Sequence, residues 1–317
     1  RYLNALKLVL QYLDVSDCNM QEGSLRCDAN INIKIGDVYT PISEVKNLNS
    51  FRGVEQALKY EAERQFREYR KTGKTKEDTP KITVGWDADR GTTAVQRSKE
   101  EAHDYRYFPE PDIPPVHLTK DFLEEIRATI CELPLARRRR LMNEVGLNEY
   151  DADVLVQNRR VADYFEECSR LSGKPKESAN FVINDVLREL NERQIGIEEF
   201  AVSPRELADL IKLVDKGDIS LNIAREAVFP KMVEEGKDAQ SVIQENGLQR
   251  ISDKSELDGV VRRIVEENPK VVKDYRGGKK KALGYLMGQV MRATGGRADH
   301  RTVTSLLESY LKAPGEE

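Results

Sequence analysis

Polar residues at alternating positions of a predicted strand form the first candidate site in this sequence. Between residues 25 and 35 apolar and polar residues alternate strictly, so a strand there has one face on a core and one polar face. A second short strand is predicted over residues 41–48. The charged residues of these two segments that belong to the candidate site are Arg26, Asp28, Glu44 and Lys46. On neighbouring strands, side chains of these types can orient phosphates and carboxylates through charge-assisted hydrogen bonds.

The residues that flank the two strands extend this candidate site. Glu22, Gly23 and Ser24 form a tight element just before the first strand, suited to the close approach of a ligand, and Asn47 and Asn49 end the second. A solvated sheet face with ordinary cross-strand ion pairs explains the same residues. However, short Asp and Asn side chains dominate here, whereas long flexible charges are expected on a merely wet face. This composition favours a ligand site.

A segment rich in basic and aromatic residues occupies positions 97–109. Its composition is suited to stacking on nucleotides or to packing against a partner. The same aromatic residues would equally fill the edge of a core. His103 beside Asp104 has the composition of a general-base pair, although a lone His beside an Asp is more often structural.

The largest local excess of positive charge lies near the carboxyl end. Between residues 270 and 301 there are nine Lys and Arg residues against two acidic ones, in a chain whose net charge is -4. Lys279, Lys280 and Lys281 fall at the predicted start of a helix, where the helix dipole disfavours cations and favours an anion. A bound phosphate backbone would remove this conflict. Arg297 lies in a second exposed basic loop after that helix. A solubilising basic face is the alternative.

Other features of the composition bound the class of protein. Lys and Arg number 51 against 55 Asp and Glu, so global charge does not indicate a nucleic-acid binder. No apolar run is long enough for a membrane span. The cysteine usage agrees with a reducing compartment, so a cytoplasmic protein is expected. No Walker P-loop, GxGxxG or GxSxG motif is present. The four cysteines are scattered with no CxxC pair, so free thiols are expected and no metal site is assigned.

A run of four arginines, 137–140, follows a proline at the start of a predicted helix. Because the four side chains must spread around the helix, a partly solvated face is preferred here to a single binding stripe.

The patterning predicts an α+β part followed by an all-α part. Ser50 and Gly73 bound one long predicted helix as its N-cap and its C-terminal stop. A hairpin is predicted around residues 87–91, and prolines crowded between 109 and 115 mark the clearest boundary. The remaining helices are predicted over 3–13, from Thr119, near 134–145, 149–170 and 177–194, from a capping box at Ser203–Glu206, and near 219–234, 253–267, 280–293 and 300–312, with a softer boundary around 236–250.

Four long stretches make the sequence similar to a known family. They are MQEGSLRCDAN, EVKNLNSFRGVEQALKYEAERQ, GWDADRGTTAVQRSKEEAHDYRYFPEPDIPP and KKKALGYLMGQVMRATGGRAD. These stretches closely resemble the B subunits of bacterial aspartyl/glutamyl-tRNA amidotransferases. The resemblance covers essentially the whole chain, which is expected to be the C-terminal two-thirds of such a protein, without the family's N-terminal portion.

The resemblance implies three domains. Residues 1–116 match the later part of an α+β "cradle" catalytic domain, 117–245 a helical domain, and 246–317 a small YqeY-like helical tail. It further implies a complex that uses ATP and glutamine to convert Glu-tRNA(Gln) or Asp-tRNA(Asn) into the amidated forms. In that complex the B subunit activates the side-chain carboxylate by phosphorylation and receives ammonia from a glutaminase A subunit, and a small C subunit connects the two.

The resemblance also assigns roles to individual residues. Residues implied to line the activation pocket are Glu22, Ser24, Arg26, Asp28, Glu44, Lys46, Asn47 and Asn49. Residues implied to contact the tRNA body are Lys279, Lys280, Lys281, Arg292 and Arg297. The complex requires Mg²⁺, but the family's ligands belong largely to the missing N-terminal portion, so no metal ligand is assigned in this chain.

Two functions remain open at this point. The chain is either part of a ligase subunit that needs partner chains for turnover, or a non-catalytic helical RNA-binding module whose first part is a scaffold. ATP-dependent phosphorylation of the aminoacyl group by the intact subunit would distinguish them.

Overall fold

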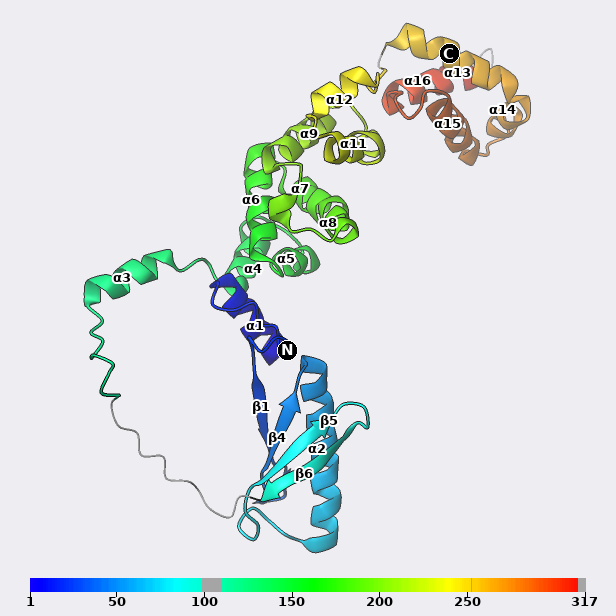
Figure 1. Ribbon diagram of the computed structural model, residues 1–317. Coiled ribbons are helices and arrows are strands. Elements are labelled where there is room, and N and C mark those ends of the chain that lie inside the picture. Colours follow the sequence, from blue (N-terminus) through cyan, green and yellow to red (C-terminus); the bar gives the residue numbers. More distant parts are fainter. Residues whose placement is uncertain (99–109, 252, 313–317) are drawn as a thin grey trace. The chain divides into compact units, whose positions relative to one another are not determined.

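The computed structural model describes residues 1–98, 110–251 and 253–312 (Figure 1). The chain divides into two units, Arg1–Pro134 and Leu135–Glu317. The first mixes strands and helices, and the described part of the second is helical apart from one isolated bridge, in agreement with the predicted α+β and all-α parts. The division falls after the helix that follows the proline-rich segment, whereas the sequence predicted a boundary near residue 116.

Four strands form the main sheet of the first unit, in the order β1-β4-β5-β6. The strands are β1 (Cys27–Ile31), β4 (Ser43–Leu48), β5 (Ile82–Asp87) and β6 (Thr92–Ser98). β4 runs parallel to β5, and the other two pairings are antiparallel. β5 and β6 are the hairpin that the sequence predicted. The parallel pair needs a crossover, which helix α2 (Phe51–Thr72) provides.

Helix α2 covers one face of this sheet and begins and ends where the sequence predicted (Figure 1). The Ser50 hydroxyl accepts a hydrogen bond from the Gly53 N–H at 3.0 Å, and Gly73 ends the helix in the left-handed region at a φ of 67°. Beneath the helix lies one apolar cluster of buried residues, which comprises Val45, Leu48, Val54, Ala57, Val84 and Trp86.

A buried polar cluster also fastens α2 to the sheet. The Glu61 side chain is fully buried, and it accepts hydrogen bonds from Arg64 at 2.8 and 2.9 Å and from the Thr93 hydroxyl of β6. Burial by itself raises the pKa of Glu61, but these hydrogen bonds outweigh burial and hold the pKa below its ordinary value. The carboxylate is therefore charged and links the helix to the far edge of the sheet.

The first predicted strand is shorter than its alternation suggested. β1 ends at Ile31, and β2 (Lys34–Ile35) pairs instead with β3 (Val38–Tyr39) in a separate small hairpin that turns through Gly36 at a φ of 61°. Polar and apolar residues alternate through both β1 and β2. The sequence pattern therefore does not reveal that the chain changes its strand partner between them.

Two further helices complete the first unit. α1 (Tyr2–Tyr12) is the predicted opening helix. α3 (Lys120–Thr129) starts at Thr119, whose hydroxyl accepts a hydrogen bond from the Phe122 N–H at 3.2 Å, as predicted. No residue of α3 is buried.

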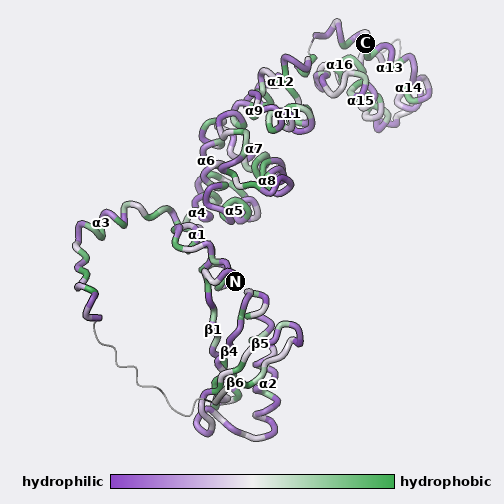
Figure 2. Tube along the Cα trace, viewed as in Figure 1, coloured by the Kyte–Doolittle hydropathy of each residue, from purple (hydrophilic) through white to green (hydrophobic). Residues whose placement is uncertain are grey.

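The second unit contains two hydrophobic cores. The helical domain surrounds the first core and consists of α4 (Pro134–Asn143), α5 (Glu149–Leu155), α6 (Arg159–Ser172), α7 (Pro175–Phe181), η1 (Val182–Val186), α8 (Leu187–Arg193), η2 (Ile197–Glu199), α9 (Pro204–Lys216), α10 (Leu221–Ile223), η3 (Ala224–Val228), α11 (Phe229–Glu235) and α12 (Ala239–Glu245). The tail bundle surrounds the second and consists of α13 (Lys254–Glu267), α14 (Pro269–Arg276), α15 (Lys281–Ala293) and α16 (His300–Leu311). Hydrophilic and hydrophobic residues are interspersed along these helices, as is typical of amphipathic helices (Figure 2).

The predicted helices of this unit are largely confirmed. The capping box at the start of α9 is complete, since the Ser203 N–H donates to the Glu206 carboxylate at 2.8 Å and the Glu206 N–H donates to the Ser203 hydroxyl at 3.3 Å. Among the described residues, no helix has the length and apolarity that crossing a membrane requires.

Three helix predictions were wrong in detail. The single helix predicted over 149–170 is broken, because Asn158 caps a new start at α6 by accepting from the Arg160 N–H at 2.9 Å. α12 lies inside the predicted boundary at 236–250, and α14 was not predicted. Both helices are only seven or eight residues long, so each carries too few apolar residues to show a clear period.

Candidate functional site

The strand residues of the predicted site lie on the sheet face opposite α2, here called the open face. Ala29 and Ile31 of β1 pack on the core beneath α2, so the intervening Asp28 and Asn30 point to the open face. On β4, Glu44 and Lys46 alternate with the buried Ser43 and Val45 in the same way. The sequence prediction that one face of these strands is polar is therefore confirmed.

A β-bulge in β4 positions Asn47. Cys27 pairs with Leu48 and Ala29 pairs with Val45, so β4 has one residue more than β1 between these two pairs. Asn47 adopts a left-handed φ of 63°, and the bulge lets Val45 and Leu48, three positions apart, join the same buried cluster. Without this extra residue Asn47 would face the core. Bulges of this kind re-aim side chains and are common beside active sites.

Gly85 makes room for amide groups on the open face. It pairs with Lys46 in the parallel ladder, and a Cβ at this position would lie 2.4 Å from Nε2 of Gln96 and 3.1 Å from Nδ2 of Asn47. Any side chain here would displace both amides. Gly85 and Gln96 were not predicted, because their place beside Asn47 depends on strand order and register.

Two lysines lie close to the shielded carboxylate of Glu44 on the open face. Glu44 lies 3.1 Å from the ammonium group of Lys81 and 3.7 Å from that of Lys46, and its side chain is only 13% exposed. The more exposed Arg26 and Asp28 pair with each other at 3.0 Å. Lys81 was missed by the sequence interpretation, because nothing in the sequence shows that β5 pairs parallel to β4.

A buried hydroxyl group points to the same face without a partner. Thr83 pairs with Glu44 across the parallel ladder and is 1% exposed, yet its hydroxyl has no hydrogen-bond partner within the described residues. Because a buried unpaired polar group is costly, Thr83 Oγ1 marks a position where a ligand or a further polypeptide segment would be stabilised.

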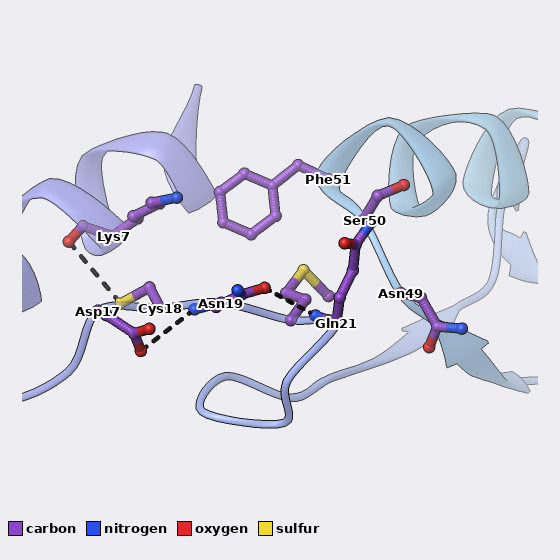
Figure 3. A pocket seen from close by; sticks show the side chains of 9 residues that line it. Lys7, Asp17, Cys18, Asn19, Gln21, Asn49, Ser50 and Phe51 are labelled. Atoms are coloured by element: carbon purple, nitrogen blue, oxygen red, sulfur yellow. Dashed lines mark hydrogen bonds between the residues drawn. The ribbon is translucent and has the colours of Figure 1, made fainter. Parts of the chain in front are cut away.

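A pocket of about 540 Å³ lies near the start of α2 (Figure 3). Its walls come from Lys7 of α1, from the loop around Asp17–Gln21, and from Asn49, Ser50 and Phe51. The predicted site residue Asn49 is thus placed in this pocket, near the N-terminus of a long helix whose first turn carries no acidic residue. A helix N-terminus together with a lysine favours an anionic group.

Glu22 and Ser24, in the loop before β1, have different surroundings from the other predicted residues. The Ser24 hydroxyl donates to the Asp17 carboxylate and accepts from the Asn19 N–H at 2.8 Å, so it closes the loop that forms one wall of the pocket. The hydrogen bond from Ser24 holds the pKa of Asp17 below its ordinary value. Glu22 is exposed in the same loop. Ser24 therefore shapes the pocket rather than lining it.

The basic residues of the tail bundle separate into two groups. Lys280, Lys281 and Arg292 are exposed and make no ion pair within the described part of the chain. Lys279 pairs with Asp274 at 2.9 Å on the surface. Arg297 is half-buried, and its guanidinium donates to the carbonyl groups of Thr294 and Gly247 at 3.1 and 2.9 Å. Its donors are thus largely used within the protein.

The arginine run at 137–140 is mostly occupied by carboxylates. Arg137 contacts Asp163 and Glu166, both at 2.7 Å, and Arg140 contacts Glu166 at 2.8 Å. Arg138 pairs with Glu149 at 2.5 Å. These ion pairs join α4 to α5 and α6. The predicted His103–Asp104 pair and the aromatic residues beside it lie outside the described residues.

The residues that the structure describes contain no group of three or more His, Cys, Asp or Glu side chains arranged to hold a metal ion. Asp28 and Glu44 are each paired with cations. The open face by itself therefore does not fit a Mg²⁺ site, and no chemical step is routed through a metal here.

Two family models match the chain. The model described as the GatB/GatE catalytic domain matches residues 1–124, and the model described as the GatB domain matches residues 163–311. The first match contains the open face and the pocket, and the second contains the tail bundle.

Curated relatives extend the similarity to nearly the whole chain. The B subunits of the aspartyl/glutamyl-tRNA(Asn/Gln) amidotransferases of Carboxydothermus hydrogenoformans and Moorella thermoacetica are each 46% identical over 312 residues. The corresponding protein of Thermotoga maritima is 44% identical over 313 residues. Each alignment covers 98% of this chain but 64% of the relative, so the chain spans less than two thirds of their length. The chain belongs to the family of aspartyl/glutamyl-tRNA(Asn/Gln) amidotransferase B subunits.

Proposed function

We propose that this chain supplies part of the activation site, and the RNA-holding surface, of a cytoplasmic tRNA-dependent amidotransferase. The substrates are Glu-tRNA(Gln) and Asp-tRNA(Asn). ATP transfers its γ-phosphoryl group to the side-chain carboxylate, which gives an acyl phosphate and releases ADP. Ammonia then attacks the acyl carbon, the amide forms and inorganic phosphate leaves. A glutaminase A subunit supplies the ammonia, and a small C subunit joins the two larger ones.

The observation that carries this proposal is the arrangement of the open face. Lys46 and Lys81 lie close to Glu44. The buried Thr83 hydroxyl, which has no hydrogen-bond partner among the residues that the structure describes, lies in register with Glu44. Phosphoryl transfer to a carboxylate brings several negative charges together, and fixed cations stabilise that charge as it develops. The amides of Asn47 and Gln96 above Gly85 add neutral donors that suit the carbonyl and phosphate oxygens.

The pocket near α2 supports the same assignment. Asn49, Lys7 and the N-terminus of α2 give it donors and positive potential, and about 540 Å³ is enough for a ligand of nucleotide size. We assign to this pocket the polar part of ATP or of the terminal nucleotide of the tRNA. The open face then receives the reacting carboxylate.

One face of α15 supports the RNA-binding part of the proposal. Lys281, Tyr285, Gly288 and Arg292 recur at helical spacing, and Lys281 and Arg292 lie about 16 Å apart along the axis. Tyr285 is 51% exposed, and no atom lies within 4 Å of a Cβ built on Gly288. A phosphate backbone can therefore approach closely between two cations beside an exposed aromatic ring.

The test is a reconstitution of the full-length protein with its A and C partners. Given Glu-tRNA(Gln) and ATP labelled in the γ-phosphate, and no ammonia source, the complex is expected to transfer label to the aminoacyl group. Added glutamine should then release labelled phosphate and form Gln-tRNA(Gln). Binding of the tRNA without any transfer of label would favour the alternative, a non-catalytic RNA-binding module.

Replacing Lys279, Lys280 and Lys281 by Ala should weaken tRNA binding and flatten its dependence on salt. Each lost phosphate contact reduces the slope of log K against log [salt] by roughly 0.7–0.9, so we expect a reduction of about 2. Binding is measured between about 50 and 200 mM salt. Lys212→Ala is the matched control, since Lys212 is paired with Asp209 on α9. An unaltered slope in the triple variant would place the basic residues away from the RNA.

A further inference from the structure

A dense set of interactions joins the tail bundle to the helical domain at one place, here called the joint. It consists of residues 217–218 after α9, residues 247–251 after α12, and residues 297–299 before α16. Three backbone hydrogen bonds lie at the joint, and one of them crosses it. The Arg250 N–H donates to the Asp218 carbonyl at 2.9 Å and so crosses from the tail side to the helical domain. The Ile251 N–H donates to the Arg297 carbonyl at 2.8 Å, and the Asp299 N–H donates to the Ile251 carbonyl at 3.0 Å. These two bonds tie the residue next to Arg250 to the tail bundle, on whose core Ile251 packs.

Side chains reinforce the joint from both sides. The Arg250 guanidinium forms an ion pair with Asp299 and donates to the Gly217 carbonyl at 3.3 Å. In the opposite direction, Arg297 of the tail bundle donates to the Gly247 carbonyl at 2.9 Å. The Arg250 and Asp299 side chains are 28% and 18% exposed, so the ion pair is shielded from water more than a surface pair is. Arg250 thus contacts Gly217 of the helical domain and Asp299 of the tail bundle at the same time.

This arrangement differs from the ion pairs inside the bundle. The Arg262–Glu266 and Lys279–Asp274 pairs connect residues close in sequence and leave the orientation of the bundle unaffected. The two hydrophobic cores are separate clusters, so little apolar packing fixes one against the other. Polar contacts at the joint must therefore set the angle between them.

We propose that Arg250 and Asp299 are positioning residues, which latch the tail bundle in the orientation that presents Lys281, Tyr285 and Arg292 to tRNA. The proposal rests on the proposed function for its ligand, but the latch is a property of the protein alone. It also gives Arg297 a role different from direct RNA contact, because its donors hold the joint together.

The latch predicts a specific pattern of amide exchange. In the full-length protein without RNA, Arg250→Gln should accelerate hydrogen exchange at Ile251 and Asp299 by about fivefold or more. Asp299→Asn keeps an oxygen for the hydrogen bond from the Thr302 N–H that starts α16, but removes the charge, and should have the same effect. The double variant should exchange no faster than either single one, because the two residues act through one contact. Arg250→Lys should restore most of the protection, and Arg262→Gln is the control.

The second readout is tRNA recognition in the reconstituted complex. Arg250→Gln and Asp299→Asn should raise the KM for tRNA by about three- to tenfold while kcat stays unchanged, and the salt slope should stay that of the unaltered protein because no phosphate contact is lost. Additive exchange effects, or unchanged exchange in both single variants, would overturn the latch. Accelerated exchange with unchanged KM would overturn the positioning role. A wild-type complex that binds no tRNA would refute the proposed function instead, and the exchange data would still decide the latch.

Discussion

Lys46→Glu in the full-length protein is expected to lower the amidation rate of the reconstituted complex by at least about 10²-fold, while tRNA affinity changes by less than about twofold. The substitution replaces a cation of the open face with an anion, next to Glu44 at 3.7 Å from the original ammonium group. In the unaltered protein the Lys46 ammonium group offsets the charge of Glu44. In the variant, the reacting carboxylate and the transferred phosphoryl group face two negative charges, that of Glu44 and that of the introduced carboxylate. The rate is measured as Gln-tRNA(Gln) formed per complex, and affinity by filter binding.

Two companion variants separate chemistry from folding. Lys46→Gln removes the charge without adding repulsion and should lower the rate by about 10–10²-fold. Lys59→Glu is the matched control, because Lys59 lies on α2, on the other side of the sheet, and is exposed in a pair with Glu55 at 2.5 Å. It should leave the rate unchanged. Full activity of Lys46→Gln, in a protein with an unaltered melting temperature, would remove Lys46 from the reaction.

The sequence predicted the polar face of the site correctly because alternation reports directly on which side of a strand a residue lies. The positions of Asp28, Glu44 and Lys46 follow from period two alone. Asn47 is different, since strict alternation would have turned it toward the core, and only the bulge returns it to the open face. A bulge depends on the partner strand, and so it left no signal in the local pattern.

Contacts between segments distant in sequence were the part that patterns did not reveal. Lys81 reaches Glu44 only because β4 and β5 are parallel neighbours. The sequence pattern placed Arg297 in an exposed basic loop, but Gly247, 50 positions earlier in the chain, provides one of its two hydrogen-bond acceptors. Caps, by contrast, are local, and Ser50, Thr119 and Ser203 were all assigned correctly from their own neighbours.

A buried ion pair in the helical domain leads to the largest expected effect on stability. Asp185 of η1 is 3% exposed, and its carboxylate lies 3.1 Å from Nε of Arg225 in η3. Arg225 also stacks over the Phe181 ring and donates to Asn180 at 2.8 Å. Arg188 lies farther from the carboxylate, at 3.7 Å, and is about half exposed. Arg225 is therefore the main partner of a carboxylate that water reaches poorly.

Arg225→Met should lower the free energy of unfolding at pH 7 by about 2–4 kcal/mol, because it leaves Asp185 buried with only the distant Arg188. This corresponds to a fall in melting temperature of roughly 4–16 °C. Arg262→Met, which breaks an exposed pair on α13, is the matched control and should cost less than about 0.5 kcal/mol. Asp185→Asn combined with Arg225→Met should recover part of the loss, since no charge then remains buried. The free energy of unfolding of the unaltered protein and of the three variants is measured by urea denaturation followed by circular dichroism.

The pH dependence of this loss identifies its electrostatic origin. Burial raises the pKa of Asp185, and Arg225 and Arg188 offset only part of that rise. A carboxyl group whose pKa is higher in the folded state than in the unfolded chain stabilises the fold at low pH and loses that contribution as the pH rises. Removing Arg225 raises the folded-state pKa further, so the deficit of Arg225→Met should shrink as the pH falls from 7 toward 4. A deficit of constant size over this range would instead assign the loss to the packing of the Arg225 side chain on Phe181.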